Sequence, residues 1–155
     1  LGQSLYLREI LGRESGSAPF VDLAAERRTG EFVRELIADG AVTAVHDCSD
    51  GGAAVAMAEM ALAGNNGFTT YIAPGLPPLV GLYFGEDQGR YLVTVKDHKA
   101  LVERAGIAQV DAVPIGMTGG SDCTFQWIAE DRVQKVPLTA LREASDSFFR
   151  DWMEA

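Results

Sequence analysis

The chain has 155 residues, 47% of them hydrophobic, and its 22 acidic and 13 basic residues give a formal net charge of −9 at pH 7. We expect a single globular domain over residues 1–155 with a sizeable core, and the lack of an apolar run of about 18 residues argues against a membrane span. Because no basic cluster offsets the acidic balance, a nucleic-acid surface is also disfavoured.

The first part of the chain alternates helix and strand signals. Residues 5–11 predict a short helix, and a loop rich in Gly, Ser and Pro follows. Asp22 stands where an N-cap is expected, before an apolar stripe with the i, i+3, i+4, i+7 spacing of a helix, and Gly40 is expected to end that helix. Residues 42–46 then predict the first strand.

The segment from residue 51 to about residue 63 predicts a helix that is apolar on nearly every face. Glu59 is its one charged residue. A helix without a polar face is typical of burial, so we expect this one to lie between layers rather than on a surface.

The rest of the chain mixes strands with two more helices. Strands are expected at residues 68–73, 80–84, 91–95, 112–117 and 123–128, the last two paired around a turn at residues 118–121. Asp97 is expected to open a helix that Gly106 stops, and a last helix carries Leu141, Ser145, Phe148 and Trp152 on one face. The alternation predicts helices packed on a mixed sheet.

A strand-to-helix turn carries the most suggestive chemistry. Between the strand at 42–46 and the apolar helix lie the carboxylates of Asp47 and Asp50, the hydroxyl of Ser49 and two glycines. A helix N-terminus presents unpaired N–H groups there, so the turn can receive a phosphate or a phosphate-bound metal. Alternatively, Ser49 or Asp50 is only an N-cap, and the glycines only let helix and strand pack closely.

The histidines and cysteines give weaker indications of a functional site. His46 has no second histidine at ligand spacing, so no histidine-based metal site is expected. Cys48 and Cys123 form no closely spaced pair, and Leu1 begins no signal or transit pattern, so a reducing, cytoplasmic setting is expected. With no basic neighbour in the sequence, Cys48 is interpreted as a small buried hydrophobe.

A second polar cluster lies between the strands expected at 80–84 and 91–95. It contains Glu86, Asp87, Gln88 and Arg90. Carboxylates suit Mg²⁺, an amide can hydrogen-bond a polar substrate, and a guanidinium suits a phosphate. The alternative is a hydrophilic hairpin connection with solvated charges. The turn at residues 118–120 can also cradle an anion, although a plain hairpin turn explains it better.

Five blocks, by their order and spacing, resemble the last domain of phosphoribosylformylglycinamidine synthase (PurL, FGAM synthase II). They are residues 1–7, residues 21–28, residues 46–52 with 58–61, residues 84–90, and residues 141–144 through 153. The resemblance covers essentially the whole chain and implies the α+β fold of the AIR synthase-related C-terminal domain. That fold is PurM C-terminal-domain-like, an α/β sandwich of helices packed on a mixed sheet. It also implies a fragment truncated at its N-terminal edge, upstream of Leu1.

The resemblance implies a function as well. This family converts formylglycinamide ribonucleotide, ATP and glutamine-derived ammonia to formylglycinamidine ribonucleotide in purine biosynthesis. ATP and Mg²⁺ would serve the intact enzyme, with none tightly bound to this segment. Its partners would be the remaining PurL domains and, in a short-form enzyme, the glutaminase subunit PurQ and PurS. The family's catalytic histidine and main ATP site lie in other domains, so this chain alone is expected to be inactive.

Site residues follow from the resemblance position by position. Asp47 matches a Mg²⁺ ligand, and Ser49 matches a residue that touches an auxiliary nucleotide. Glu86, Asp87 and Gln88 are the counterpart of a substrate-contacting Glu-Ser-Gln triplet, with Asp87 departing from it by an added negative charge. Two other hypotheses stay open: a non-catalytic scaffold or partner-docking module of the same fold, and a free-standing phosphate-binding regulator.

Overall fold

The computed structural model of the chain describes residues 1–72, 79–127 and 132–154. The described residues belong to two compact units. Unit 1 comprises Leu1–Met57 and Pro77–Pro114, and unit 2 comprises Ala58–Leu76 and Ile115–Ala155. The boundary falls inside helix α2 (Gly52–Gly64).

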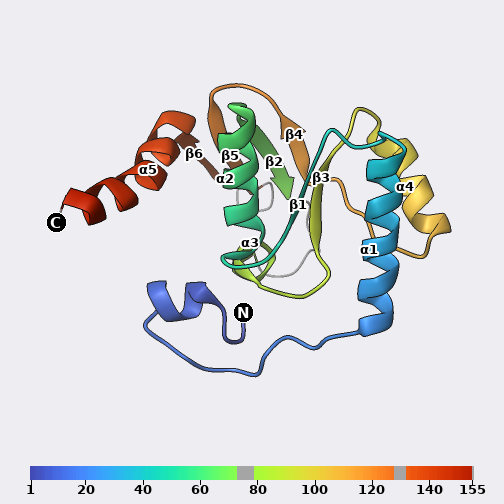
Figure 1. Cartoon of the computed structure of the whole chain (residues 1–155), viewed down its shortest axis with the longest axis horizontal. Coiled ribbons are helices and arrows are strands. Elements are labelled where there is room, and N and C mark those ends of the chain that lie inside the picture. The colour runs from blue at the N-terminus through green and yellow to red at the C-terminus, as the bar shows by residue number, and fades with distance from the viewer. Residues whose placement is uncertain (73–78, 128–131, 155) are drawn as a thin grey trace. The chain divides into compact units, whose positions relative to one another are not determined.

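Unit 1 holds a two-stranded sheet and most of the helices (Figure 1). Strands β1 (Ala44–Asp47) and β3 (Tyr91–Thr94) pair antiparallel, with Ala44 opposite Thr94. The other elements are η1 (Tyr6–Ile10), a short helix of π type, α1 (Leu23–Ala38), the start of α2, α3 (Leu79–Phe84) and α4 (His98–Ile107).

The helix starts that the sequence predicts are confirmed by their caps. The Asp22 carboxylate accepts the Ala24 and Ala25 amides at 3.0 Å, and Asp97 accepts two amides in the first turn of α4 in the same way. Each carboxylate pairs two of the donors that a helix start leaves without an intrahelical partner. At the other end of α1, Gly40 has a φ of 65°, so the expected stop is confirmed as well.

The expected stop of α4 at Gly106 is wrong. The helix continues to Ile107 and has Ala108 as its C-cap. Gln109, with a φ of 55°, takes the left-handed conformation that usually falls to glycine after a helix. The glycine therefore sits inside the last turn rather than beyond it.

Among the described residues of unit 1, two clusters of apolar side chains lie in the interior. In the first, Phe32 and Leu36 of α1 pack against Ala105 of α4, so these two helices lie side by side. In the second, Cys48 packs with Ala53 and Ala56 of α2, and Leu92 of β3 covers them. The second cluster holds the start of α2 against the sheet.

Unit 2 is built on a four-stranded sheet in the order β4-β2-β5-β6. Strand β2 (Phe68–Ile72) pairs antiparallel with β4 (Gly116–Thr118) and parallel with β5 (Asp122–Trp127), and β6 (Arg132–Pro137) pairs antiparallel with β5. The sheet is therefore mixed, as predicted. Helix α5 (Leu138–Glu154) follows β6 directly.

Two strand predictions differ from the structure, and one strand of the structure was not predicted. Residues 80–84 form most of helix α3 instead of a strand. The predicted pairing of residues 112–117 with 123–128 is wrong because β2 lies between β4 and β5. Strand β6 is absent from the elements that the sequence predicts. The predicted strand ends at residues 73 and 128 lie outside the described residues.

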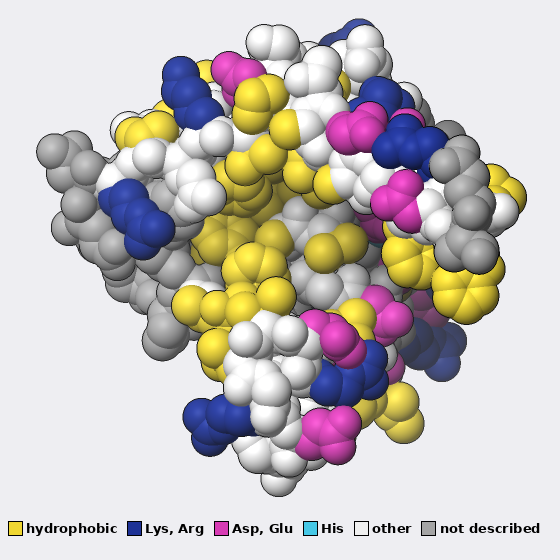
Figure 2. Space-filling model, turned by 90° about the vertical axis from the view of Figure 1, so that its left-hand side faces the viewer, with side chains coloured by type: hydrophobic (Ala, Val, Ile, Leu, Met, Phe, Trp, Pro, Cys, Tyr) yellow, Lys and Arg dark blue, Asp and Glu magenta, His cyan; other side chains and the backbone are white. Residues whose placement is uncertain are grey.

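Burial of α2 follows the prediction only in part. Ala53, Ala56, Met57 and Ala61 are buried, whereas Val55 is 39% exposed and Glu59 is exposed. Elsewhere hydrophobic side chains lie on the surface among charged ones (Figure 2), and Trp152 of the predicted α5 face is 76% exposed. Within the described residues, the apolar helices fall short of what a membrane crossing requires.

Candidate functional site

A cavity of about 330 Å³ in unit 1 brings the two polar clusters of the sequence together. Three segments line it: the N-terminal segment, the turn after β1, and the loop before β3. The lining residues are Gly2, Gln3, Pro19, Glu26, Asp47, Cys48, Ser49, Asp50, Glu86, Gln88, Gly89, Arg90 and Tyr91. Of the residues that the sequence selected, Asp47, Ser49, Glu86 and Gln88 thus meet at one site.

The turn after β1 depends on its two glycines. Gly51 and Gly52 have φ values of 78° and 68°, which L side chains rarely adopt. A Cβ on Gly52 would lie 2.7 Å from both the Tyr83 and the Gly85 carbonyl oxygens. The turn is therefore packed on the backbone that ends α3, a close approach to a helix end rather than the packing of helix on strand that was considered for the glycines.

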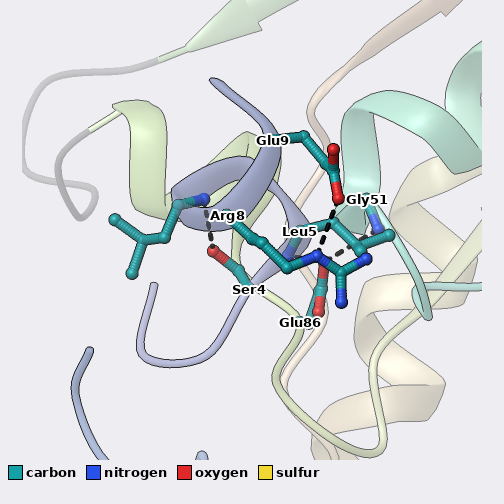
Figure 3. A network of polar contacts seen from close by, with 7 residues as sticks. Ser4, Leu5, Arg8, Glu9, Gly51 and Glu86 are labelled. Atoms are coloured by element: carbon teal, nitrogen blue, oxygen red, sulfur yellow. Dashed lines mark hydrogen bonds and ion pairs between the residues drawn. The ribbon is translucent and has the colours of Figure 1, made fainter. Parts of the chain in front are cut away.

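Glu86 joins this turn to the N-terminal segment (Figure 3). Its Oε1 accepts the Gly51 amide and the Leu5 amide, each at 2.9 Å. The Gly51 amide, which the sequence offered to an anion or to a local cap, is thus paired with a carboxylate 35 residues away. Leu5 is the N-cap of η1, so one oxygen serves the starts of two helices.

The N-terminal segment is held at Glu86 by further contacts. Ser4 is only 1% exposed, and its Oγ accepts the Leu7 amide at 3.4 Å. The Tyr6 ring stacks on Phe84 of α3, with ring centroids 4.6 Å apart. The short helix η1 therefore lies against the end of α3, next to the loop that carries Glu86.

Arg90 lines the cavity, but its guanidinium also makes hydrogen bonds to neighbouring groups of the protein. Its guanidinium donates to the Leu82 carbonyl at 2.8 Å, and to the Gly85 carbonyl and the Asp87 carboxylate at 3.2 Å. A guanidinium at the last carbonyls of a helix satisfies acceptors that lack intrahelical partners and suits the negative end of the helix dipole. Asp87 is exposed and pairs with Arg90, whereas Gln88 lines the cavity.

Charge in the cavity is predominantly negative. Glu26, Asp47, Asp50 and Glu86 bring four carboxylates against the single guanidinium of Arg90. An uncompensated phosphate would meet repulsion here, whereas a phosphate carrying a cation would not. Within the described residues, no group of three or more His, Cys, Asp or Glu side chains could hold a metal ion.

Cys48 and His46 fit structural roles. Burial raises the pKa of the Cys48 thiol, and this outweighs the opposing effect of the Arg90 guanidinium, a basic neighbour that the sequence did not reveal. A thiol kept protonated is a poor nucleophile, which supports the interpretation of Cys48 as a small buried hydrophobe. His46 Nδ1 lies 2.7 Å from the Asp47 carbonyl oxygen.

Two polar residues of the cavity, Gln3 and Glu26, lie in blocks of the family pattern but were not selected as site residues. Glu26 lies on α1 and Gln3 lies near the start of the chain, where the side-chain amide of Gln3 donates to the Gly16 carbonyl at 2.8 Å. Neither residue belongs to the two polar clusters, residues 47–50 and 86–90, from which the site was predicted. Only the fold brings them to the turn after β1.

Comparison with known proteins identifies relatives of the whole chain. The family described as AIR synthase related protein, C-terminal domain, matches residues 1–128. Phosphoribosylformylglycinamidine synthase subunit PurL of Novosphingobium aromaticivorans is 54% identical over 154 residues, which are 99% of this chain and 18% of that protein. The PurL subunit of Zymomonas mobilis is 48% identical, again over 99% of this chain and 20% of that protein. The chain thus spans about a fifth of the length of these relatives.

Solved structures of Thermotoga maritima proteins have the same fold. PurL complexed with FGAR superposes with a TM-score of 0.70 at 22% identity, over 84% of this chain and 23% of that chain. The structure of PurLQS gives a TM-score of 0.68 with the same identity and coverage. These likenesses confirm the predicted fold, helices on a mixed sheet. The chain belongs to the family described as AIR synthase related protein, C-terminal domain.

Proposed function

We propose that this chain serves as the last domain of an enzyme that makes formylglycinamidine ribonucleotide from formylglycinamide ribonucleotide, ATP and ammonia. The observation that carries the proposal is the 54% identity to a PurL subunit over 154 residues, which are 99% of this chain. Identity of this extent along the whole chain supports a shared role within a longer enzyme.

In that reaction the substrate's amide oxygen attacks the γ-phosphorus of ATP, and ADP leaves. Ammonia then adds to the activated carbon, and phosphate leaves with the oxygen. Positioning and electrostatic stabilisation dominate catalysis of such phosphoryl transfer. No residue of this chain is assigned a catalytic step. Its contribution is to complete the fold and to present the acidic cavity of unit 1.

Asp47 is proposed as one ligand of a nucleotide-bound Mg²⁺, and Ser49 as a contact to that nucleotide. The acidic lining supports a phosphate that arrives with its cation rather than alone. Mg²⁺ demands near-octahedral oxygen coordination, and Asp47 supplies a single carboxylate, so phosphates and other parts of the enzyme must provide the other ligands. Bound there, the metal would neutralise phosphate charge.

Gln88 is the member of the triplet best placed for a substrate contact, because its exposed side chain lines the cavity. Glu86 also lines it, but one of its oxygens already accepts two amides. Asp87 is paired with Arg90 at 3.2 Å, so a substrate contact by Asp87 would have to break that pair.

The proposed partners are the remaining domains of the enzyme and, in a short-form enzyme, PurQ and PurS. The Thermotoga maritima PurLQS structure, which contains a protein of the same fold, supports such an assembly. A cytoplasmic location is proposed with it. The competing proposal is a non-catalytic scaffold that completes this assembly, for which the cavity would have no ligand.

A chimera tests the function. This chain replaces the matching segment of the Novosphingobium aromaticivorans PurL subunit, and formylglycinamidine ribonucleotide synthesis is measured with ammonia, ATP and Mg²⁺. We expect activity in the chimera and none in the chain alone. An inactive but folded chimera would contradict the proposal.

Substitutions in the chimera separate ligand binding from scaffolding. Asp47→Asn is nearly isosteric and removes one charge, so we expect it to reduce thermal stabilisation by Mg-ADP while leaving the fold intact. Asp111→Asn is the matched control, because Asp111 is an exposed carboxylate of unit 1 outside the cavity. Equal stabilisation in both variants would favour the scaffold.

A further inference from the structure

We propose that Glu86 is a positioning residue, which shapes the cavity by holding two backbone segments with one carboxylate oxygen instead of by contacting a ligand. The proposal concerns the protein's own geometry and does not depend on the enzymatic role proposed above. Figure 3 shows the Glu86 side chain reaching the backbone at both Leu5 and Gly51.

The two bonds of Glu86 connect separate walls of the cavity. The Leu5 amide belongs to the N-terminal segment, whose Gly2 and Gln3 line the cavity. The Gly51 amide belongs to the turn that carries Asp47, Ser49 and Asp50, which also line it. Glu86 itself lies in the third wall. One side chain therefore fixes all three segments relative to each other.

Within the turn the Gly52 amide donates to the Ser49 carbonyl at 2.9 Å, and the Cys48 amide before it donates to the Arg90 carbonyl at 2.8 Å, so Glu86 is the side chain that ties the turn to the N-terminal segment. Gly51 and Gly52 have no side chains, so this part of the turn can be held only through its backbone, and the Gly51 amide is the group that Glu86 reaches. A charged acceptor makes stronger hydrogen bonds to amides than a neutral one. The bond from Glu86 to Gly51 is thus well suited to hold the turn where its polar side chains face the cavity.

Three substitutions of Glu86 distinguish the effect of its side-chain length, its reach, from the effect of its charge. Gln keeps the length of Glu and an oxygen that can accept two amides, but loses the charge. Asp keeps the charge, but its carboxylate is withdrawn by one methylene. Ala loses both. If Glu86 acts by reach, Glu86→Gln retains the wild-type geometry and Glu86→Asp does not. If it acts on a ligand or metal through its charge, the order is reversed.

Backbone amide hydrogen exchange of the 155-residue chain reads the two bonds directly. For Glu86→Asp and Glu86→Ala we expect exchange at Leu5 and Gly51 to rise by about tenfold, since one hydrogen bond's worth of stability corresponds to roughly that factor. In Glu86→Gln the rise should be about threefold or less. Asp87→Asn is the matched control, because it removes a carboxylate from the same loop without touching either amide.

Thiol labelling provides a second readout that a general loss of stability would not reproduce. Cys48 lines the cavity, whereas Cys123 is a fully buried cysteine of unit 2. Opening of the turn should raise the labelling rate of Cys48 relative to Cys123 in Glu86→Asp by about tenfold, with Glu86→Gln close to wild type.

Each outcome decides the proposal. Protected amides and a wild-type labelling ratio in Glu86→Gln, together with loss of both in Glu86→Asp, would support it. Protection in Glu86→Asp equal to or above that in Glu86→Gln would overturn it. If Glu86→Ala does not fold, the comparison of the Gln and Asp variants still decides, because each keeps part of the wild-type side chain.

Discussion

The turn at Gly52 gives the sharpest test of how unit 1 is packed. Gly52 and Gly40 have nearly the same left-handed backbone, with φ values of 68° and 65°. A Cβ on Gly40 would meet nothing within 4 Å, whereas a Cβ on Gly52 would lie 2.7 Å from two carbonyl oxygens. The two Gly→Ala substitutions should therefore cause similar backbone strain, and only the substitution at Gly52 adds a steric clash.

The expected magnitudes follow from these two contributions. In both variants the Cβ in a left-handed conformation costs about 1–2 kcal/mol, and the stiffer unfolded chain returns about 0.4–1 kcal/mol. Gly52→Ala must in addition displace backbone, and overpacking of this kind costs about 1–3 kcal/mol. We therefore expect the free energy of unfolding to fall by about 1–3 kcal/mol more in Gly52→Ala than in Gly40→Ala.

Urea unfolding followed by far-UV circular dichroism measures both variants under the same conditions. The difference should appear as a lower midpoint for Gly52→Ala at an unchanged slope. Equal losses in the two variants would refute the close approach of the turn to the end of α3. That result would contradict the packing on which the shape of the cavity depends.

Three further predictions concern a core side chain, a cap and a thiol. Met57→Asp should lower the free energy of unfolding by about 3 kcal/mol or more, because Met57 is 7% exposed and an unpaired charge would be buried there. An unchanged melting temperature would show that this face of α2 is exposed. Asp22→Ala should cost about 1 kcal/mol by freeing the Ala24 and Ala25 amides, which chemical denaturation can measure, and a loss near zero would mean that water replaces the cap. Burial raises the pKa of the Cys48 thiol. The stability that the protonated thiol contributes is therefore complete below the pKa of an unfolded thiol, about 8.5, and is lost as pH rises through the folded pKa. The urea midpoint should therefore fall less steeply above that pH in Cys48→Ala than in wild type, and identical slopes would contradict this.

The candidate site was partly accessible from the sequence. Asp47 and Ser49 could be selected because they follow a strand and precede an apolar helix, and Glu86 and Gln88 because they form a compact polar cluster. All four line one cavity. The partner of the Gly51 amide could not be predicted, because a carboxylate 35 residues away competes with nearby caps only once the chain is folded.

Local signals determined the helix starts and the fold class. Asp22 and Asp97 cap helices with their own side chains, over a few residues, and this interaction needs no tertiary contact. The alternation of apolar segments likewise determined that helices pack on a sheet. These properties depend on neighbours along the chain, and so the sequence carries them directly.

Only the tertiary structure decided the conformation of residues 80–84 and the order of the strands. The short apolar run suits a strand as well as a helix, and α3 is favoured by the Arg90 guanidinium at its last carbonyls and by Tyr6 stacked on Phe84. The turn before β5 resembles a hairpin, yet Phe68 pairs with both Thr118 and Cys123, so β2 separates the two strands. Hydrogen bonds between strands distant in sequence set this order, and local residue patterns do not encode them.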